Sequence, residues 1–217
     1  KGKTPRRKKR KSFANESLGG QNERNEPIKR RIKLEQENIE FGKIIVSETA
    51  MNSENPHDVI LSNISIINLM REEKVNDDLI HEDALMSYYL DYYWTQLSEG
   101  NFAQFVHKSC WDKELNELIE EGLALIGAEK HLELFQQQSK KVKLMSSVKL
   151  TKFLKGKLEG VNPVRDSLNS DTFFELEENL ITLNANFLKS HPDFEVLSVD
   201  EIFETLEEFV GHEIKRV

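Results

Sequence analysis

Apolar residues recur at helical spacing along much of the chain, and the strongest such run lies between His81 and Ser98. Tyr88 and Tyr92 fall on one broad side of the predicted helix, while Leu90 and Trp94 cover much of the opposite side. A helix that is apolar almost all round belongs in the centre of a bundle. We therefore expect these aromatic side chains to form core rather than to cradle a ligand.

The apolar run is interrupted soon after Ser98, where Gly100 and Asn101 both tolerate a positive φ angle. A short helical segment then leads toward Trp111. The pattern therefore predicts a long helix, a sharp break and a second short helix in direct succession.

Two neighbouring helices are predicted next. Ser109 and Asp112 have the spacing of a capping box, with Asp in place of the usual Glu, and mark the start of the first. Gly127 suits the residue just beyond its end. A second helix follows over residues 128–138, and the tight link makes the two helices antiparallel or angled neighbours.

Two more helices are predicted toward the C-terminus. Thr172 with Glu175, and Ser198 with Glu201, both have capping-box spacing. The first helix carries a narrow apolar seam, and the last turns its apolar residues inward. The seam consists of Phe173, Leu176, Leu180, Leu183 and Phe187, and the inward set consists of Ile202, Phe203, Leu206, Phe209 and Val210.

Two stretches allow more than one structure. Residues 28–46 fit a short helix, but Phe41–Val46 within them has strand propensity. Residues 139–170 fit either a small hairpin or a basic amphipathic helix, since Val-Lys-Leu occurs there twice. Local pattern alone does not choose between these alternatives.

The predicted elements indicate an all-α fold, a compact multi-helix bundle preceded by a basic arm that is flexible when alone. Asn55 can cap a helix and Pro56 suits its first position, so the folded domain is expected to begin there. We divide the chain into a basic arm over residues 1–27, a linker or short secondary structure over 28–54, and an acidic helical domain over 55–217.

Charge is distributed unevenly along the 217 residues, whose formal net charge is -8. Residues 1–43 carry 14 basic and 6 acidic residues, while residues 44–217 carry 16 and 32. Acids concentrate from Asp171 to Glu213, with 12 acids and one base, and seven lysines without an acid lie between Lys140 and Lys157. Such blocks mark solvated segments or interaction surfaces.

The basic arm can be read in two ways. On the simpler interpretation it is a solvated tail. On the sharper one it is an arm that binds nucleic acid or another acidic surface, or a nuclear localisation signal if the source is eukaryotic. We expect no contact with a membrane, because no apolar run is long enough to span one, and a cytoplasmic location, because a single cysteine fits a reducing compartment. The basic residues concerned are Arg6, Arg7, Lys8, Lys9, Arg10 and Lys11.

The sequence offers no recognisable set of catalytic or metal-binding residues. Its six histidines include no pair at helical spacing, and His107 with Cys110 lacks a second pair to complete a tetrahedral site. No phosphate loop, nucleophile elbow or dinucleotide fingerprint occurs. We therefore expect no metal, no cofactor and no enzymatic activity, and we read the histidines as structural.

Three motifs occur in the order found in a known family. Residues 88–94 read Tyr-Tyr-Leu-Asp-Tyr-Tyr-Trp, residues 99–105 read Glu-Gly-Asn-Phe-Ala-Gln-Phe, and residues 125–129 read Leu-Ile-Gly-Ala-Glu. This succession resembles the bacterial DNA-mimic protein family of DMP19-like proteins, over residues 79–195 with a gap. Asn101 departs from the second glycine that the family often has. The family-like turn residues are Gly100, Asn101, Phe102, Gln104, Phe105 and Gly127.

The resemblance implies an all-helical, non-enzymatic protein that presents carboxylates as if they were DNA phosphates and so occupies a transcription regulator. On this hypothesis the chain is an acidic protein-binding module, with DNA mimicry as its sharper form, and its partner is a basic DNA-binding or regulatory protein. The contacts we expect are Glu175, Glu178, Asp200, Glu201, Glu204, Glu207 and Glu208.

A second hypothesis, from a different class, is a nucleic-acid-associated protein that binds through Arg6–Lys11 and through Lys141–Lys157. The two hypotheses can be combined if the basic arm folds back on the acidic helical domain. The sequence leaves a homodimer open as well.

Overall fold

The computed structural model describes residues 40–216. Most of these residues lie in helices, which confirms the predicted all-α fold. Two short strands are the exception, pairing in parallel as a small sheet. The elements are β1 (Ile44–Ser47), α2 (Glu48–Met51), α3 (His57–Glu72), η1 (Asp77–Leu79), α4 (Glu82–Lys108), α5 (Lys113–Leu125), α6 (Glu129–Lys143), α7 (Ser147–Lys155), α8 (Pro163–Leu168), α9 (Thr172–Glu175), α10 (Leu180–Lys189), β2 (Phe194–Leu197) and α11 (Val199–Val210).

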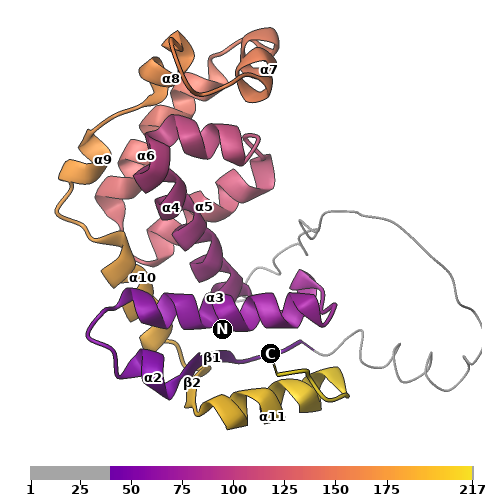
Figure 1. Ribbon diagram of the computed structural model, residues 1–217. Coiled ribbons are helices and arrows are strands. Elements are labelled where there is room, and N and C mark those ends of the chain that lie inside the picture. Colours follow the sequence, from indigo (N-terminus) through magenta and orange to yellow (C-terminus); the bar gives the residue numbers. More distant parts are fainter. Residues whose placement is uncertain (1–39, 217) are drawn as a thin grey trace, which may run out of the picture.

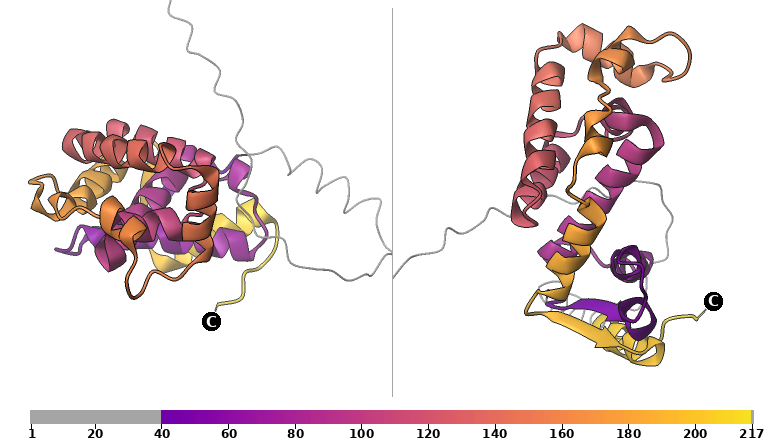
Figure 2. Two further views of the ribbon diagram at one scale, coloured as in Figure 1. Left: turned by 90° about the horizontal axis from the view of Figure 1, so that it is seen from above. Right: turned by 90° about the vertical axis from the view of Figure 1, so that its left-hand side faces the viewer.

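The buried residues form two hydrophobic cores. The first lies among α4, α5 and α6 and is closed by α7, α8 and α9, while the second lies around the sheet, between α3 and α11. Figure 1 shows α7 and α8 at one end of the molecule and α11 beyond the sheet at the other, and the right-hand view of Figure 2 shows the same separation from the side. Helices α4 and α10 contribute to both cores and join them.

The predicted break after Ser98 is confirmed within α4. Gly100 and Asn101 leave the helical conformation, and Asn101 has a φ of 63°. A Cβ atom on Gly100 would lie 2.8 Å from the Cβ of Gln104, so the turn has no room for a larger residue there. Phe102 and Phe105 follow the break and are fully buried in the first core.

The helix pair α5–α6 forms as predicted, with one correction at its start. Asp112, not Ser109, is the N-cap of α5, because its carboxylate accepts a hydrogen bond of 2.9 Å from the N–H of Leu115. Ser109 instead closes α4. Gly127 has a φ of 75°, which is the left-handed conformation expected just beyond a helix end.

Residues 139–170 form helices rather than a hairpin. Helix α6 continues to Lys143 and α7 follows from Ser147, so the hairpin alternative is wrong. The predicted helix from Thr172 is also wrong in part. It stops after one turn at Glu175, where the capping box is not formed, and the seam resumes only in α10. The box at Ser198 and Glu201 is confirmed.

The folded part extends further toward the N-terminus than residue 55. Strand β1 is buried and pairs with β2 from Ile44–Phe194 to Ser47–Leu197, and Phe41 is buried with it. The structure therefore confirms the strand alternative at Phe41–Val46, because this segment supplies the strand with which β2 pairs. The basic arm over residues 1–27 lies outside the described residues.

Candidate functional site

Helix α11 presents the acidic face that the sequence predicts. Ile202 and Leu206 are buried against the sheet, and this fixes the opposite side of the helix toward solvent. Asp200, Glu204 and Glu208 lie there in one stripe at four-residue spacing, and all three are exposed. The helix therefore holds a short row of carboxylates on a rigid support.

Several of the predicted contact residues are already used within the protein. Glu201 accepts hydrogen bonds from the hydroxyl and the N–H of Ser198, and these bonds lower the pKa of Glu201. Asp200 pairs with Arg216 at 2.6 Å. Glu207 accepts a hydrogen bond of 3.0 Å from the N–H of Ile214. Of the five acids on α11, Glu204 and Glu208 have carboxylates that form neither an ion pair nor a hydrogen bond with another described residue.

Glu175 and Glu178 do not join this face. The Glu178 carboxylate accepts the backbone N–H groups of Lys130 and His131 at 3.0–3.1 Å, and so it caps the start of α6. Glu175 is exposed at the end of α9. Helix α9 lies beside the first core, away from α11 (Figure 1). The seven acids that we expected as contacts therefore do not form one patch.

A second acidic face, which the sequence analysis did not single out, lies on α5 and α6. Residues 112–133 hold seven acids and two lysines, and both lysines are in ion pairs, Lys113 with Glu117 and Lys130 with Glu177. A hydrogen bond of 2.6 Å between Glu120 and Gln136 joins the two helices on this side. The acids of the two helices are Glu114, Glu117, Glu120, Glu121, Glu129 and Glu133.

The turn residues form a scaffold rather than a binding surface. The Asn101 amide donates to the carbonyl of Ser170 at 3.2 Å and accepts from its N–H at 3.0 Å. Asn169 accepts the N–H of Ala103 at 3.0 Å. These bonds join the break in α4 to the start of the α9 segment. Gln104 is partly exposed and donates to Glu99 at 3.2 Å.

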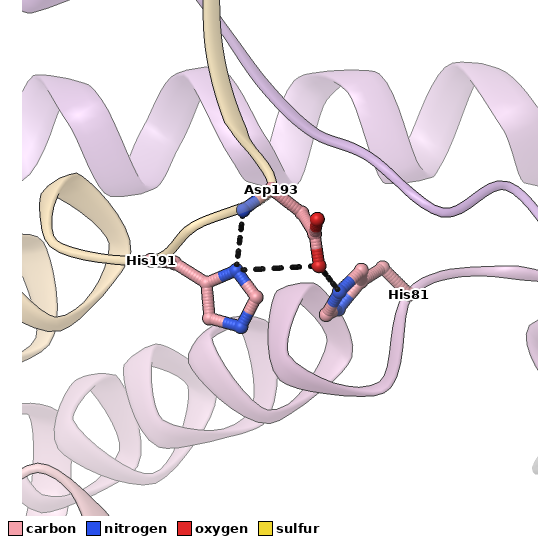
Figure 3. A group of neighbouring side chains, drawn as sticks. All are labelled: His81, His191 and Asp193. Carbon is pink, nitrogen blue, oxygen red and sulfur yellow. Dashed lines mark hydrogen bonds and ion pairs between the residues drawn. The ribbon is translucent and has the colours of Figure 1, made fainter.

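One polar cluster brings together residues that are far apart in the sequence (Figure 3). The rings of His81 and His191 meet edge to face at 4.9 Å, and His81 Nε2 lies 3.4 Å from the Asp193 carboxylate. His191 Nε2 lies 3.1 Å from the Asp83 carboxylate. Ligand atoms of His81, His191 and Asp193 all lie within 4.8 Å of one another, which is close enough to consider a metal ion.

Hydrogen bonding in this cluster favours protons over a metal. His81 Nδ1 accepts the N–H of Asp83, and His191 Nδ1 accepts the N–H of Asp193, both at 3.1 Å. Each neutral ring therefore carries its proton on Nε2, where it faces a carboxylate. An ion would displace the proton of His81 and compete for the lone pair of His191. We interpret the cluster as a clamp that joins the start of α4 to the end of α10.

An open groove runs beside α11, between α2 and α3. Leu61, Ile66, Leu69, Ile202 and Phe203 give it an apolar lining, and serine and threonine hydroxyls supply most of its polar groups. Among the described residues that line the groove, Asp58 is the one acid.

Comparison with known proteins identifies the family. A family model described as DMP19-like protein matches residues 78–191, which is more than half of the chain. The chain belongs to the DMP19-like family. No curated protein and no solved structure matches the chain.

The DMP19-like match covers α4 to α10 and with them the whole of the first core. The acidic face of α5 and α6 lies inside the match, whereas α11 and its acids lie outside it. Within residues 40–216 of this DMP19-like protein, none of the helices is long and apolar enough to cross a membrane.

Proposed function

We propose that this DMP19-like protein is a non-enzymatic, acidic protein-binding module that acts as a DNA mimic on a basic DNA-binding or regulatory protein. Family membership supports the proposal, because the family is one of DNA mimics. The acidic face of α5 and α6 carries it, since this face belongs to the part of the chain that the family shares.

The geometry of that face suits mimicry of a phosphate backbone. Acids three or four residues apart on one helix lie about 5–6 Å apart at Cβ. Duplex DNA presents one charge about every 3.4 Å along each strand. The glutamates of α5, together with Glu129 and Glu133 at the start of α6, form a shorter and sparser row of charges of the same sign. The first core packs directly beneath α5 and α6 and fixes the positions of the two helices that carry the carboxylates. A basic groove would find them already placed for binding.

The face on α11 is a second contact surface, and this helix carries five of the seven acids that the sequence predicted as contacts. Glu204 and Glu208 are unpaired there, and Asp200 completes the row when Arg216 is displaced. The two faces can be separated by experiment, because each can lose three charges without loss of a buried side chain.

The test is competition with DNA. A DNA-binding protein captured on the immobilised chain is mixed with its own duplex, and gel shift measures whether the full chain displaces that duplex. E117Q/E120Q/E133Q should weaken displacement about tenfold, with a steep dependence on salt. D200N/E204Q/E208Q is the charge-matched variant for α11. If the duplex and the chain bind together, or both variants act like the parent, the proposed function is wrong.

The arm residues Arg6–Lys11 keep a nucleic-acid role as a separate hypothesis. Deletion of residues 1–27 should abolish a salt-sensitive shift of duplex DNA by the full chain. An unchanged shift would exclude the arm.

A further inference from the structure

The seven lysines between Lys140 and Lys157 form an exposed basic surface at the end of the molecule opposite α11 (Figure 1). We call it the lysine end. Lys141 donates to the carbonyl of Ser167 at 3.3 Å, and none of the seven forms an ion pair with a described residue. Their charge is therefore uncompensated within the described protein. The seven are Lys140, Lys141, Lys143, Lys149, Lys152, Lys155 and Lys157.

The lysine end is a folded surface. Helix α7 is capped by the Ser146 hydroxyl, which accepts the N–H of Lys149 at 3.3 Å. Phe153 is buried in the first core on its inner side. His107 Nε2 reaches the carbonyl of Gly156 at 2.9 Å and holds the end of the helix. The outward side chains of α7 thus project from a fixed support.

Exposed apolar side chains lie in the same segments as these lysines. Val161, Leu144 and Val148 are 96%, 87% and 78% exposed, and they are the most exposed large apolar residues of the described chain. Val148 shares the outer stripe of α7 with Lys152 and Lys155, and Leu144 follows Lys140 by four residues at the end of α6. The surface thus alternates positive charge with bare aliphatic groups.

We propose that the lysine end binds the surface of an anionic lipid bilayer. Lysines near such a surface are attracted to its negative potential, and exposed aliphatic groups enter the boundary between headgroups and acyl chains. This is attachment to one face of a bilayer by a protein whose described helices do not span it. An anionic membrane surface is thus added to the partners of this protein, although the sequence alone led us to expect no contact with a membrane.

Nucleic acid fits the surface less well. Residues 140–157 contain no arginine, and their single aromatic residue, Phe153, is buried. Guanidinium groups and exposed aromatic rings are the groups that recognise phosphates and stack on bases. Aliphatic side chains gain nothing against a phosphate backbone. A second copy docked symmetrically is disfavoured too, because it would bring seven lysines against seven.

Co-sedimentation of the full chain with vesicles tests the proposal. The chain should bind vesicles of phosphatidylcholine with one-third phosphatidylserine and should not bind pure phosphatidylcholine. K149Q/K152Q/K155Q should lower the partition coefficient about a hundredfold, since each lysine contributes about fivefold at an anionic surface. Arg6–Lys11 stay unchanged in every protein, so this loss belongs to α7.

Two further variants complete the design. L144S/V148S should weaken vesicle binding that persists in high salt, because insertion of aliphatic groups is not screened. K43Q/K74Q/K215Q removes three exposed lysines beside the second core, away from α7, and should bind like the parent. Circular dichroism shows that each variant is folded. Equal binding to neutral vesicles, no loss on changing the α7 lysines, or binding of a 20-base-pair duplex without binding of vesicles would each overturn the proposal.

Discussion

The two cores of this protein differ in the kind of side chain that fills them. The largest buried side chains of the first core are aromatic, and neighbouring helices supply them. The largest fully buried side chains of the second core are aliphatic, and its sheet joins segments from both ends of the described chain. Rings contact one another edge to face throughout the first core, whereas the second depends on β-branched residues between a sheet and helices.

This difference follows the family boundary. The first core falls within the family match, and strands β1 and β2 with α11 fall outside it. The shared part is thus a helical unit with its own aromatic core. The remaining segments form a second layer around it, and the two layers share α4 and α10. The following changes test whether the layers behave as one cooperative unit.

Removal of a central ring should have the largest effect. The Phe102 ring stacks on Phe173 with centroids 5.8 Å apart and meets Phe135 edge to face at 5.9 Å. Phe102→Ala leaves a cavity in the first core and should lower the free energy of unfolding by about 3–5 kcal/mol. Urea denaturation measures this loss. Phe174→Ala, at an exposed position beside the same core, should cost less than half as much.

A change in the second core tests the coupling of the two layers. Ile44→Ala removes a fully buried side chain from β1 and should lower stability by about 2–5 kcal/mol. Both tryptophans, Trp94 and Trp111, pack against the first core, and Trp111 lies away from the second, so tryptophan fluorescence reports chiefly on the first core. The fluorescence midpoint should shift as far as the circular dichroism midpoint. A midpoint that stays in place would show that the layers unfold separately.

Loss of a helix cap should cost less and should cost the same in either layer. Ser198 caps α11 beside the second core, and Asp112 caps α5 beside the first. Ser198→Ala and Asp112→Ala should each lower stability by about 1 kcal/mol, because each leaves one N–H group of the first turn without its acceptor. Thermal denaturation compares the two. A loss confined to one variant would mean that one layer does not limit global stability.

The smallest expected effect is the change of stability with pH. Its sign for His131, in the first layer, is opposite to its sign for His212, in the second. Burial lowers the pKa of His131, whose Nε2–H donates to the carbonyl of Glu178 at 3.1 Å. Below about pH 6.5 the unfolded chain therefore binds this proton more readily, and stability falls as the pH drops toward the lowered value. Hydrogen bonding to Glu73 raises the pKa of exposed His212, so its small contribution is lost as the pH rises through that raised value.

Melting temperatures between pH 5 and pH 8 measure both contributions. His131→Gln should flatten the fall toward acid, and His212→Gln should leave that fall intact. An unchanged acid slope in His131→Gln would refute the assignment.

Periodicity and caps predicted much of the helical structure. The apolar run of α4, its break at Gly100 and Asn101, and the box at Ser198 are local signals, and the structure confirms each. The helix expected from Thr172 ends early because Asn179 caps a new start, accepting the N–H of Thr182. Local pattern favoured the wrong cap where two polar residues competed, as at Ser109 and Asp112.

Contacts across the chain could not be predicted in the same way. His81 and His191 meet only because α4 and α10 pack together, and no spacing between residues more than 100 positions apart encodes that contact. The acids of α11 were correctly placed outward by their helix period. Their separation from Glu175 and Glu178 depends on the path of the chain between α9 and α11, which charge counts do not contain.

The parallel pairing of β1 with β2 also governs how this protein is made. The two strands are about 150 residues apart, so β1 leaves the ribosome well before its partner has been synthesised. At ordinary elongation rates that interval lasts on the order of 10 seconds. During that time an apolar strand has no neighbour to pair with, while the helices that follow can already assemble. We therefore expect the apolar side chains of β1 to stay exposed until β2 has been synthesised.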